Sequence, residues 1–142
     1  SRYIIQNKSE YYRLLQDVRD HHNWEDWILF MLEAVINVSK QSISLIKDIK
    51  TEMMKYKNII RSYYPKIYSQ DLLNNIFKHP YTKIEFLQND LNISRQTAAK
   101  YLDTLVEDKN KILEKIKLGR ENYYINTGLM RLFTEYDYSL KK

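Results

Sequence analysis

The chain has 142 residues, 44% of them hydrophobic, and it carries 23 Lys and Arg against 18 Asp and Glu, which gives a net charge of +5. With only 2 Gly and 2 Pro, a mainly helical fold is expected rather than a barrel or a sandwich. The absence of Cys excludes disulfides, cysteine zinc sites and thiol nucleophiles. The sequence has no run of about 18 apolar residues and no signal peptide, so we expect a cytoplasmic protein with no membrane partner.

The first predicted element is a helix that ends at His21, His22 and Asn23. Ser9 is its candidate N-cap, because a hydroxyl there can accept a backbone N–H of the first turn. The two His residues suggest a metal site, but adjacent residues of a helix point in different directions and the spacing places no third ligand. We therefore expect no metal.

A long helix is predicted from Trp24 to about Arg61, a stretch without Gly or Pro. The polar residues 37–42 predict a kink or a turn within this stretch. Beyond them the apolar residues follow heptad spacing, at Ile46, Ile49, Met53, Tyr56, Ile60 and Tyr63. Residues 46–63 therefore have two interpretations, which are a homodimer interface and packing against the chain's own helices.

Pro65 marks the predicted domain boundary, because the residue before a proline is disfavoured in the α region. It divides the chain into a helical region at residues 1–64 and a second domain at residues 65–142. Ser69 can cap the first helix of that second domain.

Two further capped helices are then predicted, and they meet across a turn of two residues. The turn and the second helix lie in the segment Leu91–Val106. Thr82 and Glu85 have the spacing of a capping box for the first of them, and Ser94 is the predicted N-cap of the second. Asn92 tolerates the left-handed backbone that a tight turn needs. The inner face of the second helix is formed by Ala98, Leu102 and Leu105.

A β-hairpin is predicted after these helices, with strands at residues 112–118 and 123–125 and the turn GREN at residues 119–122. Thr127 can cap a last helix. Three helices followed by a hairpin is the order of a winged helix-turn-helix, in which the hairpin is the wing. The expected fold class is mainly α, with an N-terminal helical segment followed by a winged helix-turn-helix that contains a small β-hairpin.

The exposed side of the second helix and the hairpin carry residue types that bind phosphates and base edges. The candidate DNA-binding residues are Ser94, Arg95, Gln96, Thr97, Lys100, Tyr101 and Thr104 on the helix, and Lys115, Lys117 and Arg120 on the hairpin. Asp103, Glu107 and Asp108 would repel phosphates, and the positive charge is spread over both halves of the chain. Double-stranded DNA and a protein partner therefore remain alternative ligands.

The first 40 residues contain the patterns S-x-Y-I, Y-Y-x-x-L-x-x-V-R and W-x-x-W-I-x-F-x-L-x-x-V. They are formed by Ser1, Tyr3 and Ile4, then by Tyr11, Tyr12, Leu15, Val18 and Arg19, and then by Trp24, Trp27, Ile28, Phe30, Leu32 and Val35. This segment resembles the one that follows the catalytic motif in Fic-family proteins, named for filamentation induced by cyclic AMP. Some members of that family also carry a C-terminal winged helix.

The resemblance implies that the chain is the C-terminal region of a protein that transfers AMP from ATP to protein hydroxyls, with ATP and Mg expected in the parent protein. The family's catalytic loop, H-x-F-x-x-G-N-G-R, is not present, because His79, Pro80 and Tyr81 are followed by Thr82 and Lys83 rather than by a Gly-rich loop. No catalytic residue, cofactor or metal site is assigned to this chain. The catalytic loop is expected before its first residue.

Two functions from different classes are then in competition. In the first, the chain is a non-catalytic region of a Fic-type AMP transferase, whose winged helix binds DNA, a protein partner or the parent's own Fic domain and so regulates or localises the enzyme. In the second, it is a free-standing bacterial transcription regulator that dimerises through its long helix. An enzyme in its own right has little support, because no paired carboxylates, nucleophile triad or phosphate loop occurs.

Overall fold

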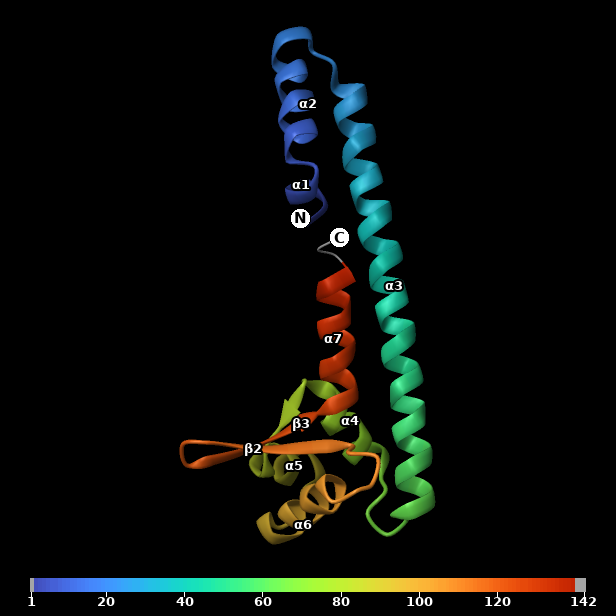
Figure 1. Ribbon diagram of the computed structural model, residues 1–142, viewed down its shortest axis with the longest axis vertical. Helices are drawn as coiled ribbons and strands as arrows, with labels where there is room; N and C mark the ends of the chain where they lie inside the picture. Colours follow the sequence, from blue (N-terminus) through green and yellow to red (C-terminus); the bar gives the residue numbers. More distant parts are fainter. Residues whose placement is uncertain (1, 140–142) are drawn as a thin grey trace. The chain divides into compact units, whose positions relative to one another are not determined.

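The structure is a computed structural model and describes residues 2–139, so that Ser1 of the first sequence pattern and residues 140–142 of the expected second domain lie outside the described residues. Its elements in chain order are α1 (Arg2–Gln6), α2 (Lys8–His21), α3 (Trp24–Tyr63), α4 (Gln70–Lys78), β1 (Tyr81–Thr82), α5 (Ile84–Leu91), α6 (Arg95–Val106), β2 (Leu113–Leu118), β3 (Glu121–Asn126) and α7 (Thr127–Ser139) (Figure 1). The predicted fold class, mainly α with a small hairpin in the C-terminal part, is confirmed.

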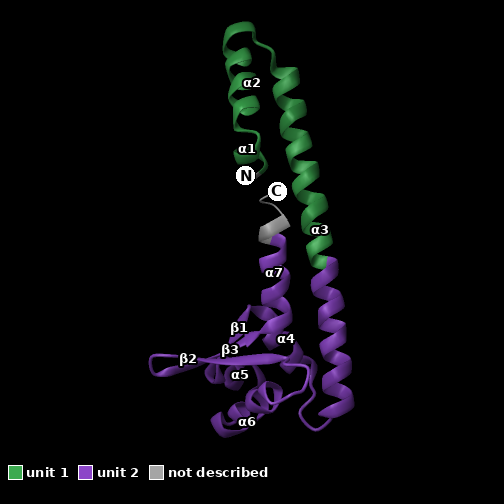
Figure 2. Ribbon diagram, in the orientation of Figure 1, with its two compact units in different colours: residues 1–46 green, residues 47–142 purple. Residues whose placement is uncertain are grey.

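The chain divides into two compact units, residues 1–46 and residues 47–142, which we call unit 1 and unit 2 (Figure 2). The division falls within α3 and not at Pro65, because Tyr56 and Ile60 near the end of α3 are only 3% and 0% exposed and belong to the core of unit 2. The expected domains at residues 1–64 and 65–142 stay a prediction, and they do not coincide with these units.

Unit 1 is built from α1, α2 and the first part of α3. Its buried side chains are Leu14 and Val18 of α2 and Phe30 and Ala34 of α3. The turn between α2 and α3 contains His22 at φ 55°, whose N–H donates to the carbonyl of Val18, so the predicted helix end is confirmed. The predicted cap at Ser9 is wrong, because α2 begins one residue earlier and Asn7 precedes it.

Much of the apolar surface of α3 in unit 1 is exposed. The exposed side chains are Trp24, Ile28, Leu29, Leu32, Val35, Ile36, Val38, Ile43 and Ile46. Within residues 2–139, α3 is long and apolar enough to cross a membrane by length and composition, with a mean hydropathy of 1.3 in its most apolar window. The core helix of a water-soluble protein, which is mostly buried, and a signal sequence meet the same condition, and 11% of this window is buried, so the expectation of no membrane partner stays a prediction.

The core of unit 2 is a single cluster of side chains from α3, α4, α5, α6, the sheet and Ile112, which directly precedes β2. Its members are Tyr56, Ile60, Leu72, Leu73, Ile76, Leu87, Ala98, Leu102, Leu105, Ile112, Leu113 and Tyr124. The inner face predicted for the helix at residues 95–106 is therefore confirmed. Of the heptad residues, Tyr56 and Ile60 pack in the chain's own core, whereas Ile46 and Tyr63 are 63% and 71% exposed. Dimerisation through residues 46–63 stays a prediction.

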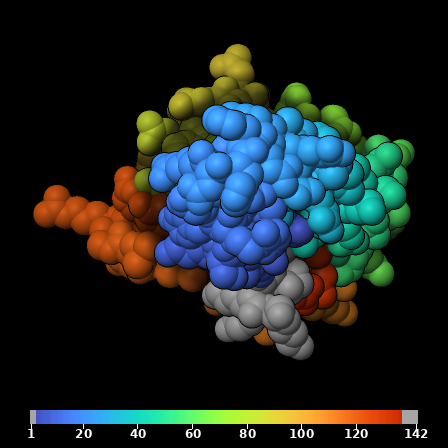
Figure 3. Space-filling model, turned by 90° about the horizontal axis from the view of Figure 1, so that it is seen from above, coloured from blue at the N-terminus to red at the C-terminus, as the bar shows by residue number. Residues whose placement is uncertain are grey.

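Unit 2 also contains a three-stranded antiparallel sheet in the order β1-β3-β2. In the hairpin Leu118 pairs with Glu121, which leaves a two-residue turn of Gly119 and Arg120. Gly119 has φ +61°, a positive value that two-residue hairpin turns require at their first central position and that glycine adopts without strain. The hairpin tip projects from the rest of unit 2 in two perpendicular views (Figure 1; Figure 3, orange).

Three local predictions need correction. Thr82 does not cap α5, because it is buried in β1, and α5 instead follows Lys83 without a side-chain cap. Thr127 does not cap α7, because the Asn126 side chain accepts the N–H of Leu129 there. No turn interrupts α3 at residues 37–42, where Asn37 and Ser42 donate to carbonyls of their own helix. Such bonds let short polar residues remain in a helix.

Candidate nucleic-acid interface

The turn between α5 and α6 positions α6 on the surface of unit 2. Asn92 adopts the left-handed conformation, with φ 52°, and its N–H donates to the carbonyl of Gln88. Ser94 then caps α6, because its hydroxyl accepts the N–H of Thr97 at 3.1 Å. Both features were predicted from the sequence. They fix the direction of α6, whose buried residues hold it against the core while its other side faces solvent.

The predicted binding residues on α6 fall into two groups. The side chains of Arg95, Gln96 and Lys100 are exposed. They form no hydrogen bond or ion pair with the other described side chains. The other four have structural partners: the hydroxyls of Ser94 and Thr97 bond to each other, Thr104 donates to the carbonyl of Lys100, and Tyr101 packs against the core. Three of the seven helix candidates are therefore available to a ligand.

The hairpin supplies two more available cations. Lys117 and Arg120 are exposed and have no partner recorded among the described residues. Lys115 instead places its ammonium 2.8 Å from the Asp103 carboxylate of α6. This carboxylate raises the pKa of Lys115. The ion pair ties the hairpin to α6 and neutralises one candidate cation.

The acidic residues at the end of α6 are expected to repel phosphate less than three free carboxylates would. Asp103 is paired with Lys115 and also accepts a hydrogen bond from the Tyr124 hydroxyl at 3.1 Å. Asp108 is only 5% exposed and accepts a hydrogen bond from Tyr64 at 2.8 Å, so it faces the interior. Glu107 is the exposed carboxylate of the three.

Arg95 and Arg120, which lie far apart in the sequence, line one hollow of about 110 Å³ between the starts of α5 and α6 and the hairpin tip. Lys83 and Glu121 also line it and form an ion pair, which raises the pKa of Lys83. Sequence reasoning missed Lys83, because its position beside the hairpin depends on the pairing of β1 with β3. A lysine before a helix carries no local signal of such a role.

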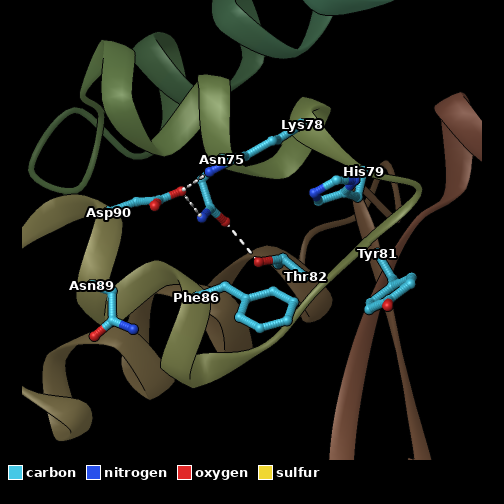
Figure 4. Close-up of a pocket in the computed structure, with 8 residues that line it drawn as sticks. All are labelled: Asn75, Lys78, His79, Tyr81, Thr82, Phe86, Asn89 and Asp90. Carbon is cyan, nitrogen blue, oxygen red and sulfur yellow. Dashed lines mark hydrogen bonds and ion pairs between the residues drawn. The ribbon is translucent and has the colours of Figure 1, made fainter.

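A second hollow, of about 220 Å³, lies between α4, β1 and α5 (Figure 4). In this hollow the Thr82 hydroxyl donates to the Asn75 side chain at 2.7 Å, and Asn75 donates to Asp90 at 2.8 Å. Lys78 lies 3.4 Å from the same carboxylate. Because these polar groups satisfy one another, we interpret them as a structural connection between α4, β1 and α5.

One family model matches the chain, and it is described as the C-terminal domain of SoFic-like protein adenylyltransferases. The match covers residues 53–129, which is more than half of the chain. The chain belongs to this family. The predicted identity as a C-terminal region of a Fic-family protein is thereby confirmed. The SoFic-like domain begins within α3, as unit 2 does, and ends in α7.

The two glycines of the SoFic-like domain do not belong to a nucleotide-binding loop. Gly119 lies at the hairpin tip, and Gly128 is packed against Glu52 and Tyr56 of α3. Within residues 2–139 no group of three or more His, Cys, Asp or Glu side chains could hold a metal ion. No step of AMP transfer is derived from these residues, and the expectation that this chain holds no cofactor stays a prediction.

Proposed function

We propose that unit 2 is a winged helix-turn-helix that binds double-stranded DNA through α6 and the β2–β3 hairpin. The observation that carries the proposal is a set of cations that have no partner among the described residues, formed by Arg95, Lys100, Lys117 and Arg120. Cations held on a rigid helix and on a projecting hairpin can contact phosphates of one duplex and release its counterions. Gln96, beside them on α6, is a residue type that reads adenine.

The parent protein is proposed to transfer AMP from ATP with Mg through catalytic residues outside this chain, and to be localised or regulated by this unit. We propose that the exposed apolar side of α3 in unit 1 packs against that catalytic part. The extent of this exposed apolar side supports the arrangement, because large exposed apolar patches mark protein–protein interfaces.

The DNA proposal is tested by titrating a fluorescent duplex with the chain and with the double variant Arg95→Ala and Lys100→Ala. Loss of two phosphate contacts is expected to weaken binding and to lower the slope of log K against log salt by about 2. The matched control is Lys66→Ala with Lys109→Ala, which removes the same charge from exposed positions outside α6 and the hairpin. Equal losses in both double variants would contradict a defined interface.

The assignment of catalysis is tested by incubating the chain with radiolabelled ATP and Mg in the presence of candidate protein acceptors. We expect no label on the chain or on the acceptors. Label transferred by this chain alone would contradict the assignment of AMP transfer to residues outside it.

A further inference from the structure

Strand β2 is an edge of the sheet in unit 2. The strand order β1-β3-β2 leaves one side of β2 without a strand partner within the described residues. Residues 114–118 are all exposed. In an antiparallel pair every second residue directs its N–H and C=O away from its partner strand, so β2 presents backbone donors and acceptors along its outer side.

The two faces of β2 carry different chemistry. Ile116 and Leu118 point to the face opposite the core and are 40% and 61% exposed. The cross-strand partner of Ile116 is Tyr123, whose ring contacts that of Tyr81 with centroids 5.4 Å apart and planes tilted by 59°, so the apolar surface continues from Ile116 across the sheet. Lysines 115 and 117 lie between these residues in the sequence and therefore point to the other face.

The lysines discourage pairing of β2 with a second copy of itself. In an antiparallel pairing centred on Ile116, Lys115 of each copy would lie opposite Lys117 of the other. Like charges directly opposite each other destabilise a strand pair. Lys117 favours a carboxylate on a partner strand, because it has no counter-ion among the described residues, whereas Lys115 is already paired with Asp103.

We propose that the outer edge of β2 binds an extended segment of a partner protein as a fourth strand, and that this segment alternates apolar and acidic residues. Its main chain bonds to the free edge of β2, as in other strand additions. Its apolar side chains continue the surface of Ile116 and Leu118, and its carboxylates lie beside Lys117. This site is separate from the α6 surface, and Lys117 is the residue that the two share.

The probe is a soluble peptide in which Glu alternates with Ile and Val, tested on the full chain by calorimetry and by amide hydrogen exchange. We expect saturable binding with slowed exchange at residues 113–117. The first control peptide has Lys in place of Glu, and the second has the same composition in blocks rather than in alternation. Equal binding of all three peptides, or no binding of the alternating peptide, would overturn the proposal.

Two variants test whether the peptide binds at β2. Lys117→Glu and Leu118→Asp are each expected to weaken peptide binding at least tenfold, and exposed positions tolerate them without loss of the fold. Matched controls are Lys111→Glu and Met130→Asp, which make the same changes at exposed positions outside β2. Leu118→Asp should leave the α6 contacts with DNA in place. A chain that dimerises through β2, or a peptide that binds without slowing exchange there, would contradict the inference.

Discussion

Gly128 lies at the start of α7, where it meets the side chains of α3. Its N–H donates to the Tyr56 hydroxyl at 2.9 Å, and the same hydroxyl lies 3.2 Å from Thr127 Oγ1. A Cβ at Gly128 would lie 2.5 Å from Glu52 Oε1 and 2.8 Å from the Tyr56 hydroxyl. Such distances are shorter than van der Waals contact. This glycine therefore permits the close approach of α7 to α3.

Replacement of Gly128 by Ala is expected to lower the free energy of unfolding by about 1–3 kcal/mol, because the added methyl group forces side chains apart. Guanidinium unfolding followed by circular dichroism measures the change. Met130→Ala, on an exposed position of the same helix, is the control. Equal stability of the Gly128 variant and the unchanged chain would show that Glu52 and Tyr56 move at no cost.

The ionisation of Asp90 makes the stability of unit 2 depend on pH. Hydrogen bonding from Asn75 lowers the pKa of Asp90, and Lys78 adds to the effect. A carboxyl whose pKa is lowered on folding adds stability above its unfolded pKa of about 3.9, and that stability is lost as the pH falls through the folded value. Asp90→Asn should therefore lower the free energy of unfolding at pH 7 by no more than about 1 kcal/mol, since the pair is partly exposed.

Unfolding at two pH values distinguishes the effect of the Asp90 charge from the effect of changing its side chain. Unfolding curves at pH 7 and near pH 2.5 are compared for the unchanged chain and for Asp90→Asn. The difference between them should shrink at the lower pH, because the unfolded state of the unchanged chain then binds a proton that the carboxyl with the lowered pKa must release on folding. A difference that stays constant would mean that the carboxylate charge does not stabilise the fold.

The roles of single polar residues could be predicted where their partners are close in the sequence. Ser69 and Ser94 cap their helices as expected, because an N-cap bonds to a backbone N–H three residues on. Thr82 has the same local appearance, but its burial depends on pairing with Tyr124, far along the chain. Lys83 and Asp108 likewise acquire their partners only in the folded domain. Non-local contacts of this kind leave no pattern in the neighbouring sequence.

At the scale of elements, α6 depends on its cap. Ser94→Ala is expected to cost about 1 kcal/mol of stability, because it leaves the N–H of Thr97 without its side-chain acceptor. Ser62→Ala on the exposed end of α3 is the control, where a change near zero is expected. Thermal unfolding monitored by circular dichroism measures both. Equal effects of the two variants would contradict the role of Ser94 as a cap.

Long elements were easier to predict than short ones. The absence of Gly and Pro indicated the long helix, and the alternation of residue types indicated the hairpin. Strand β1 was missed, because two residues between two helices carry no recognisable alternation. The turn that was one of the two alternatives for residues 37–42 does not occur, and Asn37 and Ser42 there donate to carbonyls within α3. The candidate interface stays a prediction, and the pairing of Lys115 with Asp103 was not anticipated from the sequence.

At the scale of the whole molecule, the structure predicts which fragments can fold. Tyr56 and Ile60 contribute to the core of unit 2, and burying an apolar side chain of this size contributes about 1.5–3 kcal/mol. The fragment of residues 47–142 is therefore expected to unfold cooperatively, whereas the fragment of residues 65–142 should lose most of its stability. Equal thermal transitions of the two fragments, followed by circular dichroism, would place the domain boundary at Pro65 instead.

The proposed binding of duplex DNA by unit 2 depends on four cations without partners among the described residues, Arg95, Lys100, Lys117 and Arg120. The most direct test measures the affinity of the full chain for a duplex over a series of salt concentrations. If all four cations contact phosphates, log K should fall with log salt with a slope of about −3 to −4. No binding at low salt, or binding with a slope near zero, would contradict the claim and favour a protein as the ligand of this surface.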